Sequence, residues 1–419
     1  MAPALTARGR GGGTVSSFAA RAGGVALRQR GRARLAILPA SAPHGAFSIR
    51  STMAQPPAFQ SLDPDLFARA QRLLDDDWLA RDAELAPVLP IVLARGVGQD
   101  WHKAGTFRHH LVGVARTLAL WRQPREVRLL GLLHSVYGNA FVDLVKFDPA
   151  RERARLQGAV GEAAEELVYV FCTASRSQFM RRVLAGQIEA DGTVVLDDRR
   201  LAPAVVAAFI VVSMADICEQ WFAWQEDIYS GFPDVPQVAQ GAHWMAALWP
   251  GPMRPPSRMY AAISRLGAAL RHPALAGRLP APPVFDHGRQ TLDADAEAAA
   301  ASLYWSVVSQ DQPLVQPHAA TAALEQAVRL NPWVGEPQML LAQLYLIAGR
   351  RDAALAAADG ALQCYSAWGN AWDKRVQWDA WMAWARILRQ GAVTGEWPGR
   401  LDKLNNVALR PDAAGARAA

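Results

Sequence analysis

The chain has few cysteines and no long uninterrupted apolar run. Its three cysteines, Cys172, Cys218 and Cys364, are far apart in 419 residues, so they form neither the paired spacing of a zinc finger nor a disulfide framework. This usage is typical of a reducing compartment. The longest apolar stretch, 201–215, contains a proline and a serine and is shorter than the roughly 20 residues of a membrane span. We therefore expect a soluble protein with no membrane partner.

Acidic residues are absent from the N-terminal part of the chain. Residues 1–62 contain eight arginines, no lysine and no acid, so this segment alone carries +8 although the whole chain carries +6. The remaining residues, 63–419, therefore carry −2, which argues against a basic surface for a nucleic-acid partner. The composition of 1–52 resembles a chloroplast or mitochondrial transit peptide. The alternative is that translation begins at Met53, which predicts a cytoplasmic protein.

Several cofactor motifs are also missing from the sequence. Outside the N-terminal segment we find no phosphate-binding glycine loop, no nucleophile elbow and no dinucleotide fingerprint, so we expect no nucleotide cofactor. From about Asp65 onward, apolar residues recur every three or four positions, which indicates helices. The sequence therefore predicts an all-α fold.

Caps and breakers set the limits of the expected helices. Thr106 is a suitable N-cap for a helix whose apolar stripe reaches Trp121. A second helix is predicted over 125–137, and a long apolar helix over 203–224 begins with a proline in its first turn. One short hairpin is predicted within 187–196, around an Asp-Gly turn.

Composition changes along the chain indicate two helical parts with a proline-rich connection. The predicted limits are 1–62 for a disordered N-terminus, 63–230 for the first helical domain, 231–292 for the connection with one helix, 293–406 for a second helical module and 407–419 for a disordered tail.

Three polar residues occupy apolar surroundings. His110 lies on the apolar stripe of its helix, His134 ends a leucine-rich run, and Asp216 lies in the most apolar helix of the chain. A buried carboxylate costs several kcal/mol unless it is paired or binds a metal. Two imidazoles and a carboxylate from three helices form a partial shell for divalent manganese, iron or zinc. The neighbouring His109 lies off the stripe and is not predicted as a ligand.

These residues resemble a known family. His110, His134 and the Val-Val-Ser-Met-Ala-Asp segment that ends at Asp216 resemble the HD-domain metal-dependent phosphohydrolases, particularly the stringent-response guanosine tetraphosphate hydrolases. The local signature 132–138 is more similar to an uncharacterised domain family of bacteria and algae. The resemblance covers 100–225 and implies an HD-like helical domain in which the three residues hold the metal and a phosphoester is hydrolysed.

The sequence also departs from that family. Ser135 stands where HD enzymes have a metal-binding aspartate, and 138–139 is Gly-Asn where the stringent-response enzymes have an acidic pair, so catalytic residues remain unassigned. Three interpretations stay open: a metal site, a metal-free pocket, or a structural core in which Asp216 pairs with an arginine. Ser135, Tyr137 and Arg176 are candidates for substrate binding; packing for Tyr137 and a solvated position for Arg176 are the alternatives.

The second helical module resembles tetratricopeptide repeats. Small residues and Tyr345 fall at the repeat spacing within 335–365, and the similarity covers one and a half repeats over 318–367. Because at least three repeats are normally needed for an independent array, we expect this module to pack on its neighbours. It is interpreted either as a surface for a protein partner or as a helical cap on the first domain. The tryptophans at 378, 381 and 384 are interpreted as an exposed strip or as interdomain packing.

Two functional hypotheses follow from the sequence. The first is a metal-dependent hydrolase of a small molecule, which the resemblance suggests is phosphorylated. The second is a catalytically inactive HD-like domain that binds a small ligand or, through its repeat-like helices, a protein.

Overall fold

In the computed structural model, the described residues belong to one compact unit. The described residues are 57–75, 77–102, 105–138, 144–220, 258–309 and 316–396. Most of them are helical, so the predicted all-α fold is confirmed. Predictions for 1–52, Asn139 and 407–419 lie outside the described residues. No helix in the described part of the chain combines the length and apolar character that crossing a membrane requires.

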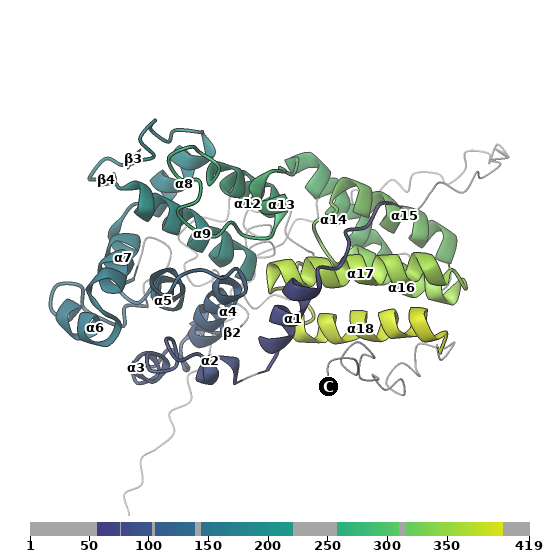
Figure 1. The fold of residues 1–419 in the computed structure, drawn as a ribbon, viewed down its shortest axis with the longest axis horizontal. Helices are drawn as coiled ribbons and strands as arrows, with labels where there is room; N and C mark the ends of the chain where they lie inside the picture. Colours follow the sequence, from purple (N-terminus) through teal and green to yellow (C-terminus); the bar gives the residue numbers. More distant parts are fainter. Residues whose placement is uncertain are drawn as a thin grey trace, which may run out of the picture. The chain divides into compact units, whose positions relative to one another are not determined.

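The helices and short strands follow one another as Figure 1 labels them. The helices are α1 (Pro64–Arg72), α2 (Trp78–Arg81), α3 (Leu89–Leu93), α4 (Phe107–Leu120), α5 (Arg125–Leu133), α6 (Arg153–Val160), α7 (Glu162–Thr173), α8 (Arg176–Leu184), α9 (Pro203–Glu219), α12 (Met259–Ala269), α13 (Phe285–Gly288), α14 (Ala294–Ser309), α15 (Pro317–Leu330), α16 (Glu336–Ile347), α17 (Arg351–Trp368) and α18 (Trp378–Thr394). The strands are β1 (Trp101–His102), β2 (Gly105–Thr106), β3 (Val194–Val195) and β4 (Arg200–Leu201), and β1 pairs with β2 and β3 with β4, both antiparallel.

Helix α9 lies at the centre of the first group of helices. Its residues from Val206 to Ala215 are all buried, and a helix that is apolar all round must be covered on every side. Helices α4, α5 and α12 provide that cover, and α5 also packs on α7 (Figure 1). The side chains of α4, α5 and α9 that face one another therefore meet inside the protein.

The start of α4 is fixed by a capping box. The Thr106 hydroxyl accepts a hydrogen bond from the His109 backbone N–H, and the His109 ring nitrogen Nδ1 accepts one from the Thr106 N–H. This reciprocal pair satisfies N–H groups that a helix start leaves without partners. It also sets the helix phase, which places His110 on the buried face.

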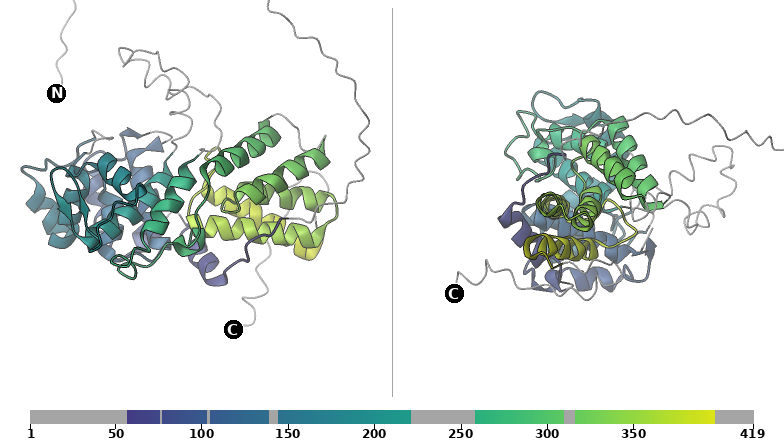
Figure 2. Two further views of the ribbon diagram at one scale, coloured as in Figure 1. Left: turned by 90° about the horizontal axis from the view of Figure 1, so that it is seen from above. Right: turned by 90° about the vertical axis from the view of Figure 1, so that its right-hand side faces the viewer.

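The C-terminal helices pack side by side. Helix α16 contacts α17, and α18 contacts both of them (Figure 2). Ala354, Ala358 and Ala361 on α17 are fully buried, which allows the close helix approach that the repeat-like spacing predicts. The module is also joined to the first helices, because the Trp121 indole N–H donates a 2.8 Å hydrogen bond to the Ala367 carbonyl.

The three regularly spaced tryptophans serve packing. Trp378 and Trp381 are buried, and Trp384 is half-buried with its ring stacked on Trp381 at 5.7 Å between centroids. The Trp378 indole N–H donates to the Tyr365 carbonyl of α17, and the Trp381 indole N–H donates to the Asp373 carbonyl. The two buried rings thus hold α18 against the preceding helix and loop, so these contacts are packing within the C-terminal module and not between domains.

Two local predictions were wrong. Helix α5 ends at Leu133, and His134 is its C-cap residue, so the predicted helix over 125–137 is four residues too long. The hairpin is formed by β3 and β4, with Val194 opposite Leu201, and not around the Asp-Gly turn within 187–196. That turn exists, because the Gly192 N–H donates to the Glu189 carbonyl and the Glu189 N–H to the Thr193 carbonyl, but the described residues on its two sides form no strand ladder.

Candidate metal centre

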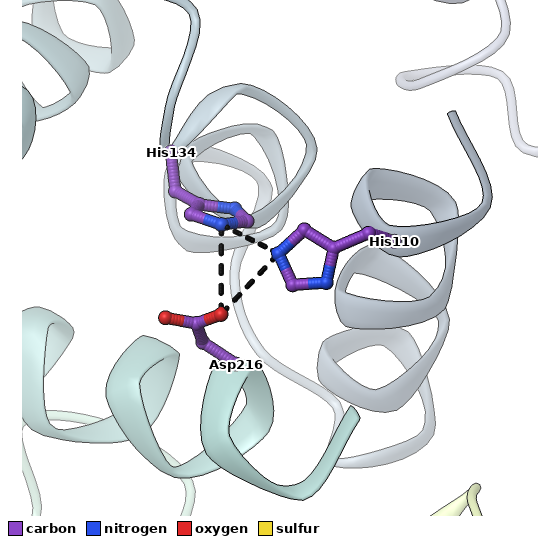
Figure 3. A group of neighbouring side chains, drawn as sticks. All are labelled: His110, His134 and Asp216. Carbon is purple, nitrogen blue, oxygen red and sulfur yellow. Dashed lines mark hydrogen bonds and ion pairs between the residues drawn. The ribbon is translucent and has the colours of Figure 1, made fainter. Parts of the chain in front are cut away.

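Three side chains selected from the sequence come together inside the first group of helices (Figure 3). His110 lies in the second turn of α4, His134 caps α5 and Asp216 lies in the last turn of α9. Their residues are 4%, 1% and 3% exposed, and one ligand atom from each lies within 4.8 Å of the others. The predicted convergence of these residues is confirmed, and the cluster is able to hold a metal ion.

The separations between the three ligand atoms suit a metal. His110 Nε2 lies 3.0 Å from His134 Nε2, and the Asp216 Oδ1 oxygen lies 3.3 Å and 3.7 Å from these two nitrogens. A point about 2 Å from all three atoms therefore exists, which matches the bonds of zinc and similar ions to imidazole and carboxylate ligands. Because the set supplies three ligands, further coordination positions stay open for water or substrate.

Each ligand is oriented by a further group. The His134 Nδ1–H donates a 2.8 Å hydrogen bond to the Gly131 carbonyl, which leaves Nε2 with a free lone pair. His110 Nδ1 is hydrogen-bonded to Glu219, the carboxylate–histidine arrangement found around protein metals. Asp216 Oδ2 accepts a 2.8 Å hydrogen bond from Arg176, so its other oxygen faces the histidines.

The electrostatics of the cluster separate the two histidines. Burial lowers the pKa of His134 to about 4, so this imidazole is neutral at pH 7. Burial acts the same way on His110, but the carboxylates of Glu219 and Asp216 outweigh it and raise its pKa to about 9. Burial disfavours the Asp216 carboxylate as well, yet the nearby charge of Arg176 holds its pKa well below the usual range.

These directions define the metal-free state of the cluster. The protonated His110 donates its Nε2–H to the neutral Nε2 of His134, and the Gln220 amide donates a 2.5 Å hydrogen bond to Asp216 Oδ1. A divalent cation would displace the proton between the imidazoles and the amide on the carboxylate. Metal and proton thus compete for the same nitrogen atoms.

A cavity of about 540 Å³ reaches the cluster through His110. Glu219 and Gln220, at the end of α9, also line it, as does His109 on α4. The loop that joins α17 to α18 lines another part of the cavity, with Asn370 and Lys374. The C-terminal module therefore takes part in forming the cavity beside the metal ligands.

The predicted substrate-binding residues are placed differently. Arg176 is buried, lies 4.3 Å above the Phe171 ring and binds Asp216, so it orients a ligand and is not a solvated surface residue. The Tyr137 hydroxyl donates to Glu165 at 2.8 Å, and Ser135 is buried. Arg176, Tyr137 and Ser135 do not line the cavity. The cavity does contain His109, which was not predicted as a ligand.

Sequence reasoning missed Glu219. It lies three residues after Asp216 on the same helix, so the two carboxylates share a helix face, and this spacing was the signal available. Asn370 and Lys374 could not be associated with the site, because more than 150 residues separate them from Asp216.

Gly113 leaves the space that Glu219 occupies. A Cβ atom at this position would lie 2.8 Å from Glu219 Cγ and 3.0 Å from Oε1. Gly113→Ala is therefore expected to displace Glu219 from His110 and to weaken metal binding about tenfold, the lower end of the effect of losing such a supporting contact. Equilibrium dialysis against zinc measures this. Gly158→Ala, where a Cβ meets no atom within 4 Å, is the control; equal affinity in both variants would contradict the role of Glu219.

Comparison with known proteins gives one partial match. Residues 91–176 match a family model described as a Domain of unknown function (DUF6817). No curated protein and no solved structure matches the chain. The matched segment includes His110, His134 and Arg176 and ends before Asp216, so the HD-like and repeat-like resemblances stay predictions. The chain is thus similar to this domain family from α3 to the start of α8.

Proposed function

We propose that this protein is a metal-dependent hydrolase of a small phosphorylated molecule. The observation that carries the proposal is the convergence of His110, His134 and Asp216 on one point beside a cavity, with each ligand held by its own partner. The sequence resemblance to HD-domain phosphohydrolases supports the class of reaction.

The residues of this site would hold the metal and fix the orientation of its ligands. A divalent metal bound here would supply a Lewis acid and lower the pKa of water at its open positions. Glu219 and the Gly131 carbonyl fix the two imidazoles, while Arg176 fixes the carboxylate. This preorganisation keeps the ligand atoms in place before substrate binds.

Stabilisation of the leaving group is assigned to a residue of the cavity wall. The acidic pair of the resembling enzymes is absent at 138–139. His109 lines the cavity, and its Nδ1 accepts a hydrogen bond from the Thr106 N–H, so in the neutral ring the proton is on Nε2. In the proposed reaction this N–H donates a hydrogen bond to the leaving-group oxygen and stabilises the negative charge that develops there.

A second candidate is a metal-free ligand-binding domain. It is favoured by the hydrogen bonds that satisfy the cluster without metal, since Asp216 is bound by both Arg176 and Gln220. In that case the cavity binds its ligand without hydrolysing it.

One experiment separates the two candidates. Full-length protein is stripped with chelator, dialysed separately against manganese, iron(II) and zinc, analysed for metal, and assayed for phosphate release from a panel of phosphomonoesters and nucleotides. We expect near-stoichiometric binding of one metal and metal-dependent phosphate release, both absent in the His134→Ala, Asp216→Ala double variant. Equal, negligible metal content in wild type and variant would refute the hydrolase, and phosphate release without metal would refute the role of the cluster.

A further inference from the structure

The loop between α17 and α18 forms one wall of the cavity beside the metal ligands. Asn370, Lys374 and Gln377 come from this loop, and Trp378 begins α18. The loop is attached to the end of α9, because the Lys374 ammonium donates a 2.7 Å hydrogen bond to the Cys218 carbonyl. Cys218 is two residues from Asp216 on the same helix. This hydrogen bond therefore joins the lysine to the helix that carries the metal ligand Asp216.

The hydrogen-bond partners of Lys374 are neutral oxygen atoms. Its ammonium donates to the Cys218 carbonyl and, at 2.6 Å, to the Asn370 side-chain oxygen. An ammonium has three donors, so one remains for a molecule in the cavity. Within the described residues, no carboxylate lies at ion-pair distance from this lysine. Burial of the ammonium lowers the pKa of Lys374, and it also strengthens the attraction between its charged form and an anion in the cavity.

Two arginines of α4 add to this charge. Arg108 lines the cavity, and no ion pair joins it to a carboxylate in the part of the chain that the structure describes. Arg116 donates a 3.4 Å hydrogen bond to the Gly369 carbonyl at the start of the loop, and its guanidinium lies 4.8 Å from the centre of the Trp378 ring. Three cations from two distant parts of the sequence thus face one space.

The acidic residues of the cavity are already engaged. Asp75 pairs with Arg81 at 3.0 Å, Glu219 is bound to His110, and the Asp379 carboxylate accepts a hydrogen bond from the Ala380 N–H. Since these carboxylates have partners of their own, Lys374 and Arg108 are able to neutralise a ligand. The complementary ligand is an anion.

The loop is held rigidly, which a binding wall requires. Buried Glu336 accepts hydrogen bonds from the backbone N–H groups of Trp372 and Asp373, at 2.7 Å and 3.0 Å. The Asp373 carboxylate in turn accepts a 2.6 Å hydrogen bond from the Tyr304 hydroxyl and pairs with Arg375. Asn370 and Lys374 therefore stand on a loop whose backbone is fixed from two sides.

We propose that Lys374, oriented by Asn370 and assisted by Arg108 and Arg116, is an anion-binding subsite that holds a phosphate group of the substrate. The inference rests on the proposed function and deepens it: the substrate carries an anionic group away from the bond that is cleaved, and the C-terminal module recognises that group. The module is then part of the substrate site, in contrast to a separate surface for a protein partner.

The test uses inorganic phosphate as the probe and metal-free full-length protein, so that the metal does not contribute. Phosphate binding is measured by isothermal titration calorimetry in wild type, Lys374→Met and Lys374→Arg. Because a hydrogen bond to a charged group is worth about tenfold or more in affinity, we expect Lys374→Met to weaken binding about tenfold and Lys374→Arg to retain most of it.

A matched control is available at the other described lysine. Lys146 is also half-buried, pairs with Asp100 and does not line the cavity, so Lys146→Met should leave phosphate affinity unchanged. Arg108→Gln provides a second test if Lys374→Met fails to fold, because the side chain of Arg108 makes no hydrogen bond within the described residues. Arg108→Gln should weaken phosphate binding at least threefold. This loss is smaller than that of Lys374→Met, and it also comes from removing a charged hydrogen-bond donor.

The outcomes distinguish this inference from the proposed function. Phosphate binding that is lost in Lys374→Met but kept in Asp216→Asn supports the subsite, even if no metal binds and the hydrolase fails. Absence of phosphate binding in wild type, or equal affinity in wild type, Lys374→Met and Arg108→Gln, would overturn the subsite whatever the metal analysis gives.

Discussion

Replacing Asp216 with alanine is expected to lower the free energy of unfolding of the metal-free protein by about 3–5 kcal/mol, because it leaves the charge of Arg176 buried without its partner. Arg176 and Asp216 are both nearly inaccessible and lie 2.8 Å apart. The same variant should lose metal binding, since a carboxylate ligand is removed. Urea unfolding at pH 7 measures the stability, and metal analysis after dialysis measures the site.

A double-mutant cycle isolates the ion pair. Arg176→Met alone should cost less than Asp216→Ala, because the Asp216 carboxylate keeps the Gln220 amide and His110, and the two changes together should cost clearly less than their sum. Asp198→Ala is the control, since its carboxylate pairs with Arg199 at the surface and a surface pair contributes about 1 kcal/mol or less. Strict additivity of the buried pair would contradict this account.

Replacing Glu336 with alanine is expected to cost about 2–5 kcal/mol at pH 5, because two buried backbone N–H groups would lose their acceptor. These groups belong to Trp372 and Asp373 in the loop that carries Lys374. We therefore expect the variant to show weaker phosphate binding as well as lower stability. Chemical denaturation followed by tryptophan fluorescence measures the stability, and isothermal titration calorimetry measures phosphate binding.

The same residue gives a pH dependence of known sign. Burial, together with the charge of Asp373, raises the pKa of Glu336 to about 7 from about 4.5. Between these two pH values the folded state therefore binds more protons than the unfolded state. The contribution of Glu336 to the free energy of unfolding is complete below pH 4.5, and it falls by about 3 kcal/mol as pH rises through 7. Glu336→Gln keeps an acceptor but has no such proton, so its stability should match wild type at pH 5 and exceed it at pH 8. Parallel profiles in the two proteins would contradict the buried, proton-binding state.

Much of the fold was predictable because its signals are local. Thr106 and Pro203 begin helices where the sequence indicated, since capping and proline effects act within one turn. The end of α5 was predicted too late, because the apolar pattern continues past Leu133 although the helix does not. The β3–β4 hairpin was misplaced, since an Asp-Gly pair predicts a turn but does not show which strands cross it.

The site was predictable only in its inner part. His110, His134 and Asp216 could be identified because a polar residue within an apolar helix is conspicuous in the sequence. The partners depend on three-dimensional contacts: Gly113 is needed because Glu219 lies against it, and Lys374 meets α9 only through folding. Arg176 was a candidate for substrate binding, yet tertiary packing directs it to Asp216.

The proton shared by the two imidazoles has a consequence for cooperativity. In the metal-free cluster the positive charges of His110 and Arg176 balance the negative charges of Asp216 and Glu219. A divalent ion that replaces this proton adds one unit of positive charge beside the cavity. An anion in the cavity then binds more tightly to the loaded protein, and thermodynamic reciprocity requires that the anion tighten metal binding by the same factor. Cofactor and substrate would each retain the other.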